Sequence, residues 1–311
     1  MTKIERVEAS LSGRELDRPP ISFWYHFGVQ HAPGARIAEL SLEFLRYYDL
    51  DFLKLMNDYY FPMPDGLSEV NSAGALGRIK PIDIHNCDWA LQLDAIDILA
   101  REMEGEAYFI DTVFDPWQVL RRSLAGEHFE RLMQDHPQAV ITALEAITES
   151  VVAYCKESIK RGSAGVFVST FGAAQQMTQE QYHTFAKPFV KQIFKEVKGK
   201  APMNTLHMHD YGVFVDDIKD IPIDILSYED RYASNPSIPE MRQHFDGSIM
   251  AGLDKWRLQL VTPADAVRNA LEGVELGGPT KFLLAPGCSF EAWFDPHSAK
   301  AMVEAVKALG R

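Results

Sequence analysis

The feature that most constrains the fold of this chain is a regular alternation of short apolar runs with helical patterns. Eight runs rich in apolar or β-branched residues each end at a polar residue or a glycine, at 20–25, 51–56, 108–114, 164–168, 203–208, 224–228, 248–252 and 281–286. Such bounded runs are typical of buried strands. Because strands that alternate with helices form parallel sheets, the sequence predicts an α/β protein with a single (β/α)8 TIM barrel.

Helical patterns fill most of the intervals between these runs. Thr178 and Gln181 have the spacing of a capping box, and we expect Pro188 to kink or divide the helix that follows. Thr262 and Pro263 supply a cap and a first-turn proline for a later helix. The predicted helices cover 37–48, 139–159, 178–197, 262–271 and 298–309.

The length and composition suit one large domain. The chain has 311 residues, of which 46% are hydrophobic, and one barrel of this size is ordinary. Residues 62–101 are less regular, and we interpret them as a strand-to-helix excursion over the barrel mouth. Because no linker is apparent, we expect residues 1–311 to form a single domain.

The charge and the cysteines exclude several classes of protein. A net charge of −13 would repel nucleic-acid phosphates. No apolar run is long enough to span a membrane, and the first residues show no signal-peptide core. Three widely spaced cysteines form no disulfide framework, so we expect a cytoplasmic protein that acts on a small molecule.

In a TIM barrel the chemistry sits where the strands end, at the carboxyl-terminal mouth. His207 and His209 are two residues apart on an extended run, so their side chains point the same way. Cys288 follows the last run and could complete a three-ligand site with an open position, as in catalytic zinc proteins. The alternatives are a polar pair at a strand end and a small buried cysteine.

Other polar and aromatic residues converge on the same mouth. Asp58, Glu229 and His26 are candidates for proton transfer or substrate orientation, and Glu229 could instead be a fourth metal ligand or a helix cap. The candidates for substrate contact are Trp24, Tyr25, Asn57, Tyr59 and Ser169. Aromatic residues in such places also serve as ordinary barrel packing.

Several segments resemble the uroporphyrinogen decarboxylase-like superfamily, which also contains cobamide-dependent methyltransferases. The similar segments span essentially the whole chain. They are 17–26 (DRPPISFWYH), 51–58 (DFLKLMND), 172–191 with MTQEQY and PF, 206–209 (LHMH) and 286–288 (PGC). The run 206–209 is similar to the strand that carries His-x-Cys in the zinc methyltransferases, and Cys288 matches their last zinc cysteine.

The resemblance implies two possible chemistries. In the methyltransferases, zinc holds a substrate thiol as a thiolate that attacks a methyl group on a corrinoid cobalt. This chain has His209 where those enzymes have cysteine, which makes the site less negative by one charge. It also lacks the corrinoid motif, because 295–300 has no glycine at the required place, so any corrinoid must come on a separate protein.

The decarboxylases need no metal and bind the porphyrinogen carboxylates through arginines that follow the first strand. The matching stretch here, 25–31, contains no arginine, although Asp58 matches the catalytic aspartate of those enzymes. The sequence therefore favours a zinc-dependent methyl- or alkyltransferase. The alternative is a decarboxylase or lyase that acts on a smaller acid with Asp58 as the acid, and not on porphyrinogen. A non-catalytic binding protein is a third reading, and the superfamily is often dimeric.

Overall fold

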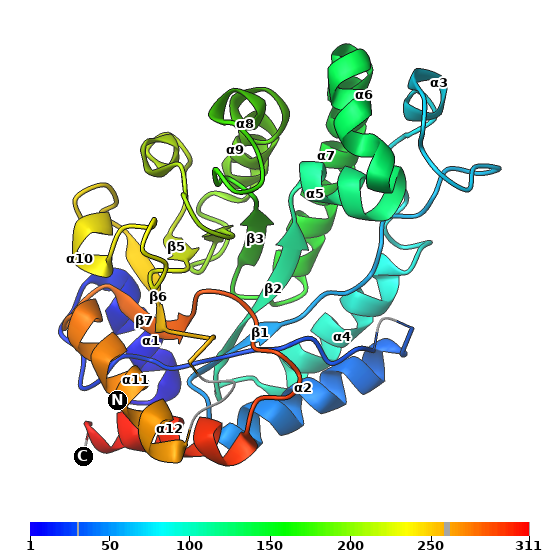
Figure 1. Ribbon diagram of the computed structural model, residues 1–311. Coiled ribbons are helices and arrows are strands. Elements are labelled where there is room, and N and C mark those ends of the chain that lie inside the picture. Colours follow the sequence, from blue (N-terminus) through cyan, green and yellow to red (C-terminus); the bar gives the residue numbers. More distant parts are fainter. Residues whose placement is uncertain (30, 258–261, 311) are drawn as a thin grey trace.

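The fold is built around a curled parallel sheet. The computed structural model describes residues 1–29, 31–257 and 262–310. In these residues, seven strands lie in chain order, and each of the first six pairs in parallel with the next (Figure 1). The strands are β1 (Phe52–Leu55), β2 (Tyr108–Phe114), β3 (Val166–Thr170), β4 (Thr205–Met208), β5 (Ile225–Tyr228), β6 (Ser248–Leu253) and β7 (Phe282–Pro286).

The segment 20–25, where we predicted the first strand, is extended but forms no regular strand. It makes isolated parallel bridges to β7 and to the residues beyond it, at Ile21 and Tyr25. Its backbone nevertheless bonds to both edges of the sheet, because Ser22 N donates to Leu284 O and Asp51 N donates to Ile21 O. Pro19 precedes the segment and Pro20 begins it, and neither has an N–H to donate, which interrupts a ladder. The eighth position of the barrel is therefore occupied by an irregular segment that joins β7 to β1.

Helices surround the outside of the sheet, as Figure 1 shows. The first helix, α1 (Lys3–Ser12), packs against three strands, β7, β1 and β2. Short η helices include the π-helix η1 (Leu120–Ala125) and the 3₁₀ helices η2 (Gly126–His128) and η3 (Val215–Ile218). The remaining α-helices are α2 (Gly34–Tyr48), α3 (Ala73–Leu76), α4 (Trp89–Glu102), α5 (Pro116–Val119), α6 (Phe129–Asp135), α7 (Pro137–Lys160), α8 (Gln179–Phe185), α9 (Lys187–Val197), α10 (Ile238–Met241), α11 (Pro263–Gly277) and α12 (Pro296–Ala308).

The local signals read from the sequence explain where several helices begin. Thr178 forms the capping box predicted for α8, and the chain starts a new helix, α9, with Pro188 in its first turn. Thr262 caps α11 in the same way, with Asp265 as its reciprocal partner. Within the irregular stretch 62–101, the structure has α3 and most of α4, and α4 packs along α2.

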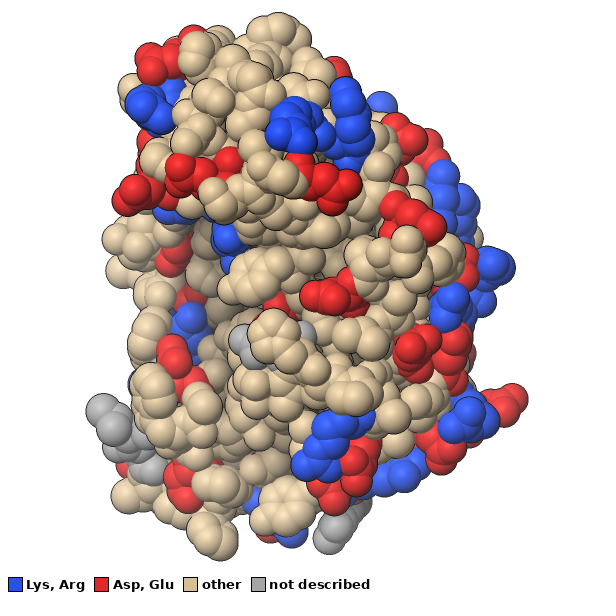
Figure 2. Space-filling view, turned by 90° about the vertical axis from the view of Figure 1, so that its right-hand side faces the viewer, with Lys and Arg blue, Asp and Glu red and all other residues tan. Residues whose placement is uncertain are grey.

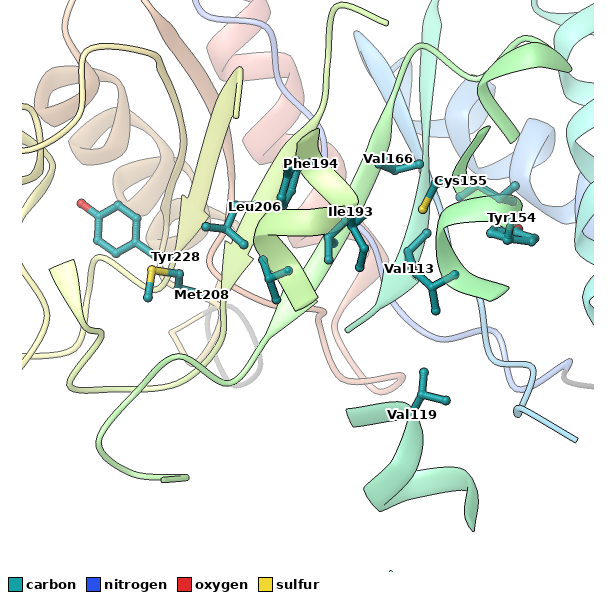
Figure 3. Close-up of a cluster of buried hydrophobic side chains, with 14 of the residues drawn as sticks. Val113, Val119, Tyr154, Cys155, Val166, Ile193, Phe194, Leu206, Met208 and Tyr228 are labelled. Carbon is teal, nitrogen blue, oxygen red and sulfur yellow. The ribbon is translucent and has the colours of Figure 1, made fainter. Parts of the chain in front are cut away.

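Two apolar clusters form the core, one on each face of the sheet. The inner cluster fills the barrel interior with alternate strand residues such as Phe52, Ile110 and Phe167. The outer cluster joins the other face of the strands to the helices, and Figure 3 shows part of it, including Leu206 and Ile193. This alternation follows from the two-residue period of a strand.

Acidic and basic side chains are interspersed on the face shown in Figure 2, and this face is hollowed on its left side. Among the described residues, no helix is both long and apolar enough to cross a membrane.

A buried ion cluster holds the irregular segment against β1. Asp51 is fully buried, accepts the backbone N–H of Ile21 at 2.9 Å and pairs with both terminal nitrogens of Arg18, at 2.5 and 2.9 Å. Arg6 of α1 also donates to Asp51, at 2.9 Å, and makes two further bonds to Asp17. One carboxylate thus connects α1, the closing segment and β1.

We expect Asp51→Asn to destabilise the protein by about 3–5 kcal/mol, because it leaves the buried guanidinium group of Arg18 without its charged partner. The free energy of unfolding, measured with urea, checks this. A matched control is Asp49→Asn, since Asp49 pairs with Lys3 and Lys307 at the surface, is 59% exposed and has a left-handed φ that asparagine tolerates. The control should lose less than about 1 kcal/mol. Equal losses in the two variants would contradict the role given to Asp51.

Candidate active site

The ends of β4 and β7 bring three candidate metal ligands together. One ligand atom each from His207, His209 and Cys288 lies within 4.8 Å of the others. His209 Nε2 is 3.1 Å from Cys288 Sγ, close to the roughly 3.5 Å that separates nitrogen and sulfur ligands on one tetrahedral zinc ion. Among the described residues, no acidic side chain completes this group. The donor set fits a tetrahedral metal with one open position.

Local backbone structure explains why the two histidines share a face. His209 N donates to Thr170 O at 2.8 Å, which continues the pairing of β3 with β4 one residue past the end of β4. His207 and His209 therefore keep strand geometry, and both point into the barrel. Their rings lie 5.5 Å apart and nearly perpendicular.

The turn after β7 needs a glycine to place Cys288. Any side chain at Gly287 would meet the backbone of Glu229, because a Cβ there would lie 2.5 Å from Glu229 Cα. The close approach of the β7 and β5 ends thus excludes every larger residue at this position. It also sets Cys288 across the barrel mouth from β4.

Each histidine has a polar neighbour beside its Nδ1 atom, a hydroxyl at His207 and a carboxylate at His209. His207 Nδ1 is 3.2 Å from Ser227 Oγ, which leaves Nε2 for a metal, and the ring stacks on Phe167. His209 Nδ1 is 3.4 Å from Asp210 Oδ2, a long contact. Gln176 Nε2 donates to the same Asp210 oxygen at 2.8 Å. Such partners orient imidazole ligands at metal sites.

Burial and charge shift the protonation of all three groups. Burial lowers the pKa of His207 to about 4, so the imidazole is neutral, as a metal ligand must be. Burial also opposes a charge on His209, but Cys288 and Asp210 outweigh it and raise the pKa of His209 to about 10. Burial would raise the pKa of Cys288, yet the two histidines hold it well below its ordinary value. The thiolate form, which binds metals, is therefore favoured.

These three residues lie in the wall of a cavity of about 240 Å³ at the barrel mouth. Of the other residues predicted for the site, Trp24, His26 and Ser169 also line this cavity. The remaining lining residues are Lys54, Met56, Thr112, Phe114, Gln118, Arg122, Phe167, Phe171 and Ser289.

The other predicted site residues lie outside this cavity. Asp58 does not line the cavity. Its Oδ1 atom is hydrogen-bonded to Nδ1 of His26, which does line it. Asn57 and Tyr59 line a smaller adjoining cavity of about 30 Å³. Tyr25 packs on the outer side against Phe27, Phe44 and Phe294.

Glu229 faces a separate cavity of about 110 Å³. It is buried beside Lys255, whose Nζ lies 3.4 Å from Oε1, and burial raises the pKa of its carboxyl group. It does not cap the next helix, α10, whose capping residue is Ser237. It is also not a member of the three-residue ligand group.

Sequence reasoning missed Lys54 and Arg122, a lysine and an arginine that line the cavity of about 240 Å³. Lys54 stands in the middle of the apolar run 51–56, two residues from Phe52 and from Met56, which both point into the barrel. A lysine at an inward position of a buried strand was the available signal. Arg122 had none, since it lies on the π-helix η1 beyond β2.

Comparisons with known proteins agree with this fold. The family model described as uroporphyrinogen decarboxylase matches residues 2–309. Uroporphyrinogen decarboxylase from Shewanella amazonensis is 23% identical over 299 residues, covering 88% of this chain and 83% of that protein. The enzyme of the same name from Klebsiella pneumoniae strain 342 is 24% identical over 298 residues, covering 87% and 82%.

Solved structures share the architecture at lower identity. A methyltransferase from Methanosarcina mazei superposes with a TM-score of 0.79 at 16% identity and covers 99% of both chains. A putative vitamin-B12-independent methionine synthase from Listeria monocytogenes gives a TM-score of 0.59 at 12% identity, covering 89% of this chain and 85% of that chain. These likenesses show the fold. With the family model matching nearly every residue, the chain belongs to the uroporphyrinogen decarboxylase family.

Proposed function

We propose that the protein is a zinc-dependent methyl- or alkyltransferase that acts on a small thiol at the barrel mouth. The observation that carries this proposal is the convergence of His207, His209 and Cys288 on one point in the cavity wall. Three protein ligands and an open position are typical of catalytic rather than structural zinc. A bound zinc ion would act as a Lewis acid that lowers the pKa of a substrate thiol.

The protein's own groups would prepare the thiol and its surroundings. Ser227 would orient the His207 imidazole through its hydroxyl, and the Asp210 carboxylate lies 3.4 Å from Nδ1 of His209. Trp24, Phe167 and Phe171 line the cavity with apolar surface, which excludes water from the nucleophile. His26 lies in the same wall with Asp58 behind it, so this pair is placed to accept the thiol proton.

The size of the cavity supports a small substrate. About 240 Å³ corresponds to roughly eight water molecules by volume, which is less than the sites that hold drug-sized ligands. A tetrapyrrole is much larger and carries several carboxylates. Since residues 25–31 also contain no arginine, the chain departs from the decarboxylases after which its family is named.

The methyl donor would be a corrinoid carried by a separate protein, as the sequence resemblance implies. Transfer breaks a cobalt–carbon bond and forms a sulfur–carbon bond, and the bonding pair stays on the cobalt. We place this chemistry in the cytoplasm, where reducing conditions keep a free thiol such as Cys288 unoxidised. We also propose that the protein forms a homodimer and binds no nucleic acid.

A second candidate function is decarboxylation or lyase chemistry on a small carboxylic acid. The hydrogen bond between His26 and Asp58 favours it, because this pair could deliver a proton to a carbanion formed in the cavity. The family name is consistent with such a reaction. A stoichiometric metal separates the two candidates, since the second requires none.

Protein purified without added metal should contain close to one zinc ion per chain by elemental analysis. Cys288→Ala should lose most of it, because only two imidazoles remain. Cys87→Ala is the matched control, since Cys87 lies outside the ligand group and should leave the metal in place. Full occupancy in Cys288→Ala would rule out Cys288 as a ligand and with it the proposed mechanism.

Uroporphyrinogen should not be turned over at a useful rate, because no arginine stands where its carboxylates would need one. Formation of the decarboxylated porphyrinogen, followed by chromatography after oxidation, measures this. A kcat/KM in the usual enzyme range of roughly 10⁴–10⁸ M⁻¹s⁻¹ would show that the family activity is retained.

Asp58→Asn should reduce methyl transfer from methylcobalamin to a thiol by about 10²–10⁴-fold, since an amide cannot help His26 take a proton. Its melting temperature should stay unchanged. The control is Asp83→Asn, where the carboxylate only accepts a backbone N–H from His85 in an exposed turn. A normal rate with lowered melting in Asp58→Asn would assign Asp58 a structural role.

A further inference from the structure

The cavity contains a buried lysine that pairs with no carboxylate of the described residues. Lys54 is 5% exposed, and its Nζ lies 3.0 Å from Met56 Sδ. The same nitrogen is 4.4 Å from the ring centre of Phe167 and 5.1 Å from that of Trp24. A thioether is a weak acceptor and the rings offer only their π-faces, so the ammonium group has no strong partner within the protein.

Such a lysine costs the fold stability. A charged ammonium group removed from water is unfavourable unless it is paired and hydrogen-bonded. Burial accordingly lowers the pKa of Lys54 to about 7, against the opposing effect of Cys288, Asp58 and Asp111. A methionine or leucine would fill this inward position of β1 without that cost. The amine is therefore placed for a ligand rather than for the stability of the barrel.

The charges around the candidate metal site indicate what the ligand must supply. A divalent cation and the Cys288 thiolate leave the site with one excess positive charge if both histidines are neutral, and Lys54 adds a second in its protonated form, which a bound anion would favour. Of the nearby carboxylates, Glu229 pairs with Lys255 and Asp58 with His26, while Asp210 lies on the outer side of His209, at its Nδ1 atom. A substrate with a thiolate and one further anionic group would neutralise both charges.

We propose that Lys54 binds a carboxylate at the far end of the substrate, so that the substrate class is that of small thiol acids. This inference rests on the proposed thiol activation and extends it to a second contact. The thiol would reach the open metal position while the carboxylate lies against Lys54, both in one cavity of about 240 Å³. A desolvated lysine discriminates strongly for an anion, because the attraction is not screened by water.

Arg122 is the competing anchor. It lines the same cavity, stacks on Phe114 at 4.1 Å and forms no ion pair with the described residues. It is, however, exposed on η1 at the rim of the cavity, where water and salt screen its charge. Lys54 is the better anchor on these grounds, and Arg122→Met is the natural control.

The test compares 3-mercaptopropionate with 1-propanethiol, which differ in one carboxylate, by calorimetric titration of the zinc-loaded protein. The natural protein should bind the acid at least about tenfold more tightly, the minimum for one charge-assisted hydrogen bond. Lys54→Met should bind both thiols equally, with the affinity for propanethiol unchanged and a melting temperature that is not lowered. Lys54→Gln provides a second uncharged variant.

The outcomes separate this inference from the proposed function. If Lys54→Met keeps the preference for the acid, or if only Arg122→Met removes it, the inference is overturned. If neither thiol binds to the metal, the proposed function fails, and the anchor is tested with butyrate on protein without added metal. Butyrate binding that Lys54→Met abolishes and Arg122→Met preserves would still support the carboxylate site, whereas equal binding by all three proteins would refute it.

Discussion

The barrel depends on the carboxylate of Asp51. Seven strands pair regularly, and the ring is completed by a segment that begins after two prolines and makes only isolated bridges. Asp51 compensates for the missing ladder bonds, because it binds the backbone of Ile21 and the guanidinium of Arg18 at the point where β1 begins. The same strand then carries Lys54 into the cavity and leads to Asp58. The position of the closing segment, and hence of Trp24 and His26 on the cavity wall, follows from this buried ion cluster.

The candidate site combines the ends of β4 and β7, which are distant along the chain and separated in the sheet by β5 and β6. The histidines follow from the period of β4, while Cys288 depends on the tight approach that Gly287 permits. The layer below the site is mostly apolar. A low dielectric beneath the site strengthens each charge interaction above it, which is the condition under which a metal and a buried lysine can act together on a small anion.

Much of this arrangement could be predicted from the sequence, and the exceptions have physical reasons. Periodicity and capping residues predicted the seven regular strands and helices such as α8 and α11, because these depend on neighbours in the chain. The period alone could not show that the extended segment at 20–25 forms only bridges. This outcome depends on the N–H donors that the prolines lack and on the contacts of Asp51. The orientation of Tyr25 was equally hidden, since alternation places Trp24 and Tyr25 on opposite faces without saying which face is the cavity.

Lys54 illustrates how the sequence and the fold inform each other. A lysine inside an apolar run lowers the hydrophobic signal of the strand, and by composition alone it marks only a weaker strand prediction. Once the barrel fixes which residues point inward, the same lysine becomes a charge in an apolar interior that nothing in the described protein neutralises. His209 changes the balance in the same direction, because the sequence resemblance implies a thiolate at this position in the zinc methyltransferases and this chain has an imidazole. Both residues make the cavity more positive, and this common sign is the strongest physical argument that its natural ligand is an anion.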